Sequence, residues 1–187
     1  NATNVNINTT GSYAGWLVGK AMYSYVGDVS VQGTVTVGND YGGGIVGSIN
    51  GTTVKNALSN VSVNKESSSQ GTHIGGLIGY IEGDATTSIV KYCMSVGDVG
   101  NSIYKSIPSA NTTDINIIKS SFTKVYERSS ATGITGVKNE TTGKMFNATD
   151  ENLRQKTFYT NTLRWNEVIW DFADIANGGY PKIKTNN

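Results

Sequence analysis

Four lysines recur at similar places in a repeating pattern, 35, 36 and 28 residues apart: Lys20, Lys55, Lys91 and Lys119. If each repeat forms one layer of stacked parallel strands, matching side chains lie about 4.8 Å apart. A ladder of ammonium groups at that spacing repels itself and would bind anions such as sialic acid or a sulfated glycan. The alternative is a solvated outer face on which the flexible lysines splay apart.

Residues suited to catalysis are few. A zinc-peptidase motif needs two histidines, and this chain has one, His73. His73 stands where earlier repeats have Tyr13 and Tyr41, which favours a stacked ring over a general base for a Ser or Cys nucleophile. The single Cys93 excludes an internal disulfide and is best explained as a small buried residue.

The acids do not suggest a catalytic or metal site either. They are scattered, and no loop has the dense run of oxygen ligands that calcium prefers. Asp28 and Asp98 recur in Gly-Asp-Val segments, where an acid is usually a turn former. We therefore expect a chain without catalytic residues, metal or cofactor, and we keep a polysaccharide-cleaving enzyme as the least favoured alternative.

The composition limits the partners. The net charge of +1 gives no electrostatic reason to bind nucleic acid, and no apolar run is long enough to insert into a membrane. Glycine is abundant, with 23 residues, and proline is rare, with 2, which suits short strands and tight turns. The first residue is Asn, so we expect a domain excised from, or processed out of, a larger chain.

A seven-residue motif organises the chain. Tyr-Ala-Gly-Trp-Leu-Val-Gly at 13–19 returns as Tyr-Gly-Gly-Gly-Ile-Val-Gly at 41–47 and as His-Ile-Gly-Gly-Leu-Ile-Gly at 73–79. Its period of 28 and then 32 residues holds about three short strands and no helix. Each strand must then pair in parallel with its equivalent in the next repeat. This predicts an all-β fold, a right-handed parallel β-helix of about four coils over residues 1–148. An antiparallel β-sandwich is the alternative.

The motif also predicts columns of equivalent residues. Leu17, Ile45 and Leu77 should form one core column, and the rings of Tyr13, Tyr41 and His73 should stack beside it. The next positions, Val18, Val46 and Ile78, form a neighbouring column, and we expect one of the two aliphatic columns to face outward or to lie at a bend. The paired glycines meet the need of corners for positive φ or close backbone approach.

Two further segments complete the predicted architecture. A degenerate fourth repeat is expected from the alignment of residues 118–122 with residues 90–94, although it lacks the glycine motif. Residues 149–187 form a small aromatic-rich C-terminal cap with a short helix at 150–156. We expect this cap to cover the open end of the stack, where apolar cross-section and strand edges are exposed.

The chain resembles a known repeat. Gly-Gly-Leu-Ile-Gly at 75–79, followed by Val-Lys-Tyr-Cys at 90–93, is similar to the GLUG motif, and the Trp- and Tyr-rich tail is similar to the segment that often closes such arrays. This resemblance implies a β-helix in a secreted or cell-wall-anchored bacterial protein, either an adhesin or the non-catalytic region of an immunoglobulin-A1-protease-type zinc metallopeptidase. It implies host glycoprotein or glycan binding, or a rigid spacer beside neighbouring domains.

Overall fold

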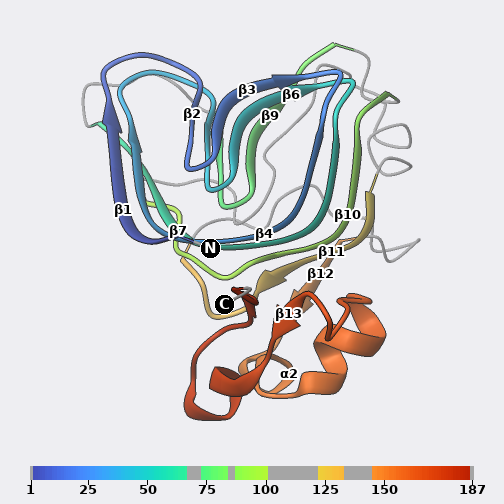
Figure 1. The fold of residues 1–187 in the computed structure, drawn as a ribbon. Coiled ribbons are helices and arrows are strands. Elements are labelled where there is room, and N and C mark those ends of the chain that lie inside the picture. Colours follow the sequence, from blue (N-terminus) through green and yellow to red (C-terminus); the bar gives the residue numbers. More distant parts are fainter. Residues whose placement is uncertain (1, 67–72, 84–86, 101–121, 133–144, 186–187) are drawn as a thin grey trace.

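The computed structural model describes residues 2–66, 73–83, 87–100, 122–132 and 145–185. These residues form a β-solenoid of about three turns, built from three parallel sheets (Figure 1). The largest sheet has the strand order β1 (Ala2–Thr9), β4 (Tyr25–Val37), β7 (Thr53–Lys65), β10 (Ile89–Ser95), β11 (Phe122–Arg128), β12 (Met145–Ala148). The two smaller sheets contain β2 (Ala14–Gly15), β5 (Gly42–Gly43), β8 (Ile74–Gly75) and β3 (Val18–Met22), β6 (Val46–Asn50), β9 (Ile78–Ile81).

The register follows the sequence repeat. Strand β4 pairs in parallel with β7 along its whole length, with Val26 beside Val54 and Val37 beside Lys65. Because equivalent residues of successive repeats are neighbours in space, each repeat is one coil. The predicted parallel solenoid is therefore confirmed, and the antiparallel sandwich is wrong.

The long strands bend at a column of left-handed residues. Asp28, Asn56, Tyr92 and Lys124 are neighbours in successive strands, and their φ angles are 51°, 51°, 56° and 53°. A left-handed residue breaks the alternation of a strand, so that Val54 and Ala57, three positions apart, both face the core. At this corner the largest sheet bends, so the strand residues before and after it run in different directions.

The glycine motif forms a notch that folds into the cross-section (Figure 1, between β2 and β3). Its glycines have no positive φ, so close approach is what they supply. A methyl group on Gly47 would lie 2.6 Å from the Tyr41 carbonyl oxygen, and one on Gly44 would overlap the Ser59 hydroxyl of the facing sheet. The arms of the notch thus pack backbone against backbone, and its tip touches the opposite wall.

This notch corrects one expectation about the aliphatic columns. Ile45, Val46, Leu77 and Ile78 are all fully buried, so neither column faces outward in the second and third coils. The physical reason is that apolar core lies on both sides of the notch, so both aliphatic positions are buried. A flat strand or a simple bend would bury only one of them. In the first coil Leu17 is 46% exposed, because among the described residues a coil lies on only one side of it.

The C-terminal segment packs on the side of the solenoid. Leu58, Met94 and Tyr126 form an outward apolar column on β7, β10 and β11, and an aromatic cluster of the C-terminal segment covers it. The Trp165 indole nitrogen donates to the Tyr92 carbonyl at 2.8 Å, and the Ser30 hydroxyl donates to the Pro181 carbonyl at 3.1 Å. The segment lies below the largest sheet in Figure 1. The expected position over an open end is wrong, because the sheet itself offers an apolar outer face.

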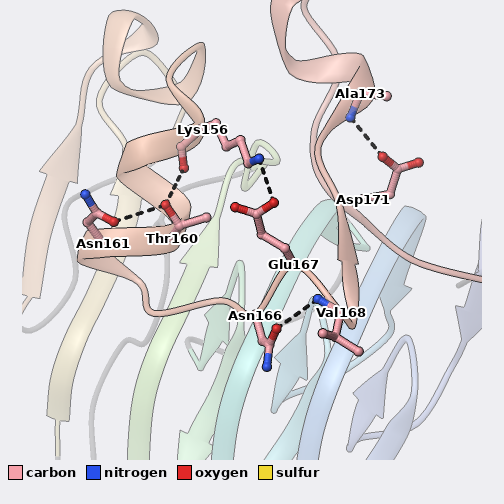
Figure 2. A network of polar contacts seen from close by, with 8 residues as sticks. All are labelled: Lys156, Thr160, Asn161, Asn166, Glu167, Val168, Asp171 and Ala173. Atoms are coloured by element: carbon pink, nitrogen blue, oxygen red, sulfur yellow. Dashed lines mark hydrogen bonds and ion pairs between the residues drawn. The ribbon is translucent and has the colours of Figure 1, made fainter.

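Within this segment the elements are short. Helix α2 (Asp150–Leu153) begins with a capping box between Thr149 and Asn152, and is shorter than the predicted 150–156. A π-helical turn (Phe158–Thr162), a 3-10 helix (Ala173–Asn177) and the antiparallel pair β13 (Trp170–Asp171) and β14 (Lys182–Ile183) follow. Figure 2 shows the polar contacts that join them, including the ion pair of Lys156 with Glu167 at 2.7 Å.

Candidate functional site

The predicted lysine ladder is reduced to one pair. Lys55 and Lys91 are neighbours in β7 and β10, as expected. Lys20 lies in β3, on a different sheet, beside Ser48. Lys119 lies outside the described residues, and the position next to Lys91 in β11 is Thr123, because Phe122 pairs with Val90. Lys20 was misaligned because the residue of the first coil that lies beside Lys55 is Gly27, on the largest sheet. At the other end the expected alignment of residues 118–122 with residues 90–94 is wrong by four residues, since Phe122 lies beside Val90 and not beside Met94.

The ring column is present as predicted. Tyr13 stacks on Tyr41 with 4.8 Å between ring centroids, and Tyr41 stacks on His73 with 5.4 Å. Tyr80 leans against both Tyr41 and His73 from the other arm of the notch. The column holds successive coils together at the mouth of the notch.

Ion pairs flank this ring column. Asp40 accepts hydrogen bonds from the backbone of Tyr41 and His73 and lies 2.6 Å from Nδ1 of His73. Partial burial opposes ionisation of Asp40, but these hydrogen bonds outweigh it and lower its pKa. Lys20 pairs with Glu82 at 2.6 Å and lies over the Tyr13 ring. The charges at the notch are thus directed at one another, which indicates a structural role.

Neither of the sequence's two nucleophile or base candidates is placed for catalysis. His73 is engaged by the ring column and by Asp40. Cys93 is buried in the core, and burial raises the pKa of its thiol to about 12. The described residues contain no group of three or more His, Cys, Asp or Glu side chains able to hold a metal ion.

A polar groove runs between the C-terminal segment and the largest sheet. It has a volume of about 250 Å³. Its floor is the outer face of β4 and β7, where Gln32 and Asn60 are neighbours in register, and its wall includes Tyr180. The full lining is Thr3, Ser30, Val31, Gln32, Leu58, Asn60, Asp174, Gly178, Gly179, Tyr180, Pro181 and Lys182.

A second, shallower groove continues from the first. It has a volume of about 400 Å³ and shares Gln32 and Asn60 with it. The remaining lining is Asn4, Asn6, Gly33, Thr34 and Ser62. Asn6, Thr34 and Ser62 form one outward column, since each pairs with the next in parallel. We call the two together the polar groove.

The polar groove is nearly neutral in charge. Among the described residues that line it, Asp174 and Lys182 alone are charged, and they pair with each other at 2.5 Å. The side-chain amides of Gln32 and Asn60 hydrogen-bond to no other described residue. Each amide offers both donors and an acceptor, so the floor can bind a ligand rich in hydroxyl groups.

Sequence reasoning missed this groove. Its floor comes from the Asn- and Thr-rich outward positions of three coils, which resemble any solvated strand face when read alone. Its wall comes from residues 174–182, far along the chain. The one usable signal was the outward alternation of Asn and Thr with Val and Ile in residues 4–8, 34–37 and 60–64.

Comparisons with protein-family models, curated proteins and solved structures find no match. The structure itself describes the chain as a parallel β-solenoid with a C-terminal segment packed on the side of its largest sheet. Among the described residues, no helix has the length and apolar character needed to cross a membrane.

Proposed function

We propose that this chain is a non-catalytic glycan-binding module of a secreted or cell-surface bacterial protein. It is a right-handed parallel β-helix of about four coils over residues 1–148, and residues 149–187 cover one side of it. Right-handedness follows from the strong preference of connections between parallel strands in one sheet. The extracellular bacterial setting rests on the GLUG resemblance.

The polar groove carries this proposal. Gln32 and Asn60 present unengaged amides on the floor, and Tyr180 presents a ring with an apolar body and a polar tip. Pyranose rings match such a lining, because their hydroxyl groups both donate and accept and their C–H faces pack on rings. Since Asp174 and Lys182 neutralise each other, a neutral glycan fits better than an acidic one.

The test is a glycan and host-glycoprotein array followed by titration of the best ligand. The double variant Gln32→Ala, Asn60→Ala removes two hydrogen-bonding side chains, each worth about 0.5–1.5 kcal/mol, so affinity should fall roughly tenfold. The matched control is Asn8→Ala, Thr36→Ala, a register pair on the same sheet face outside the polar groove. Equal affinity of the two double variants would contradict the assignment.

Acidic ligands would point to a different surface. Lys55 and Lys91 are adjacent, half-buried cations with no ion pair to a described residue. If the array selects sialylated or sulfated glycans, Lys55→Glu with Lys91→Glu should abolish binding. Unchanged affinity of that variant for the acidic glycan would exclude the lysine pair as its binding site.

A rigid spacer is the second candidate function. The in-register stacking of β4 on β7 and the fully buried core columns favour a stiff rod that sets the distance between neighbouring domains. Those neighbours would be the catalytic domain of a zinc metallopeptidase or further segments of an adhesin. Absence of saturable binding on the array would favour the spacer, and hydrolysis of an arrayed polysaccharide would revive the enzyme alternative.

A further inference from the structure

The floor of the polar groove repeats once per coil. Gln32 of β4 lies beside Asn60 of β7. A second column follows Asn6, Thr34 and Ser62 through β1, β4 and β7. None of these five side chains hydrogen-bonds to another described residue. Because neighbouring strands lie about 4.8 Å apart, free hydrogen-bonding groups recur at that interval along the axis of the solenoid.

The wall of the polar groove follows the same axis. At one end the Ser30 hydroxyl of β4 donates to the Pro181 carbonyl at 3.1 Å. At the other end Nη1 of Arg128, in β11, donates to the Tyr180 hydroxyl at 3.4 Å. Strands β7 and β10 lie between β4 and β11 in the sheet, so the wall crosses the strands. A long ligand between wall and floor must therefore run along the axis and meet one coil after another.

The interval between coils discriminates among polymers. An extended peptide advances about 3.3 Å per residue, which does not match the floor. A nucleic acid strand places a phosphate about every 3.4 Å, and the charges of the lining neutralise each other, so they offer the phosphates no net counter-charge. A chain of pyranose rings linked equatorially at opposite ring positions advances by one ring length per sugar, which is close to the strand spacing.

We propose that the polar groove binds a linear, equatorially linked neutral polysaccharide, of the cellulose or chitin type, along the solenoid axis with one sugar on each coil. This inference rests on the proposed glycan-binding function and adds the geometry of the glycan. Successive sugars of such a chain face in alternate directions, and side-chain amides and hydroxyls can serve both orientations because they donate and accept. Among the described residues three coils supply floor side chains, so three sugars can bind in this way.

Titration calorimetry with unbranched oligosaccharides of increasing length tests the proposal. In the cellulose and chitin series the affinity should rise about threefold to tenfold with each added sugar, since each gains at least one hydrogen bond. The rise should stop after the third sugar. The matched control is the α-linked glucose series of the amylose type, which has the same monomer but a curved chain. That series should gain no affinity with length.

Two variants of one strand test the direction of the ligand. Asn6→Ala should lower the affinity for a trisaccharide to that for a disaccharide, and should leave the disaccharide within about twofold of the parent chain. The matched control is Asn8→Ala, the same substitution on the same face of β1 but outside the groove lining. Both side chains are exposed, so neither substitution should disturb folding.

The outcomes separate this inference from the proposed function. If Asn8→Ala weakens binding as much as Asn6→Ala, the ligand lies along the strands and the inference is wrong. It is equally wrong if the array yields a ligand of the groove but straight and curved series bind alike, or affinity does not grow with length. In those cases the proposed function still stands. Absence of binding both on the array and in calorimetry would contradict the proposed function, and this inference with it.

Discussion

Single glycines set how closely the backbone can pack at the notch. A methyl group on Gly47 would overlap the Gly19 carbonyl oxygen and lie 2.6 Å from that of Tyr41. These are main-chain atoms, which cannot move aside as a flexible side chain can. The motif therefore requires glycine for space, even though its φ angles would suit any residue.

Gly47→Ala should destabilise the chain by about 1–3 kcal/mol or more, as overpacking of a dense site does. The free energy of unfolding in urea measures it. Gly11→Ala is the control, because its nearest neighbour would be 3.7 Å away, an ordinary contact. If both substitutions have the same small effect, the notch is not packed backbone against backbone.

Asp40 should make stability depend on acid pH. Hydrogen bonds lower its folded-state pKa below the usual 3.8, despite partial burial. The ionised carboxylate thus contributes stability that is fully present above pH ~4 and is lost as the pH falls through the lowered pKa.

Asp40→Asn tests this pH dependence. The melting temperature of the variant should lie below that of the parent chain at pH 6, and the gap should close as the pH falls below ~4. A gap in melting temperature that stays constant from pH 6 to below pH ~4 would show that ionisation of Asp40 does not contribute to stability.

Residue roles were predictable where a column repeats the same chemistry. Tyr13, Tyr41 and His73 are all planar rings one repeat apart, and they stack as expected. Lys20 was not predictable in the same way, because its alignment with Lys55 crossed from the notch to another sheet. A single residue type at a similar spacing does not fix the register.

At the scale of elements, the C-terminal segment depends on its aromatic cluster. Trp165 stacks on Trp170 with 4.0 Å between ring centroids and is anchored to Tyr92 of the solenoid by its indole hydrogen bond. Both indoles are almost fully buried. The segment is therefore held to the sheet mainly by one face of stacked rings.

Trp165→Ala should cost about 3–5 kcal/mol and release the segment from the sheet. Limited proteolysis should then cut within residues 149–185 faster than in the parent chain, while the solenoid stays resistant. Val168→Ala, at a side chain 79% exposed, should change stability by less than ~0.5 kcal/mol. Equal proteolysis of the two variants would contradict the role of the cluster.

The existence of this segment was predictable, but its position was not. The change in composition after residue 149 and the Thr149 cap are local signals, and α2 starts where they place it. Docking depends on the outward column of Leu58, Met94 and Tyr126, whose direction follows from the left-handed corner at Asn56 and Tyr92. Single left-handed residues of ordinary type leave no clear mark in a sequence.

At the scale of the whole molecule, one rule explains both the fold and the polar groove. Each repeat is one coil, so inward positions accumulate into core columns and outward positions into uniform surfaces. The uniform Asn, Gln, Thr and Ser surface of β1, β4 and β7 becomes a groove only where residues 174–182 lie against it.

The most direct test is a methyl NOE spectrum of the chain labelled at Val, Leu and Ile. Val26, Val54 and Val90 are buried register neighbours, 28 and 36 residues apart. The account predicts NOEs from Val54 methyl groups to both Val26 and Val90, and from Ile45 to Leu77. Absence of these contacts, with NOEs instead between strands adjacent in sequence, would contradict the coil-per-repeat fold and the surfaces inferred from it.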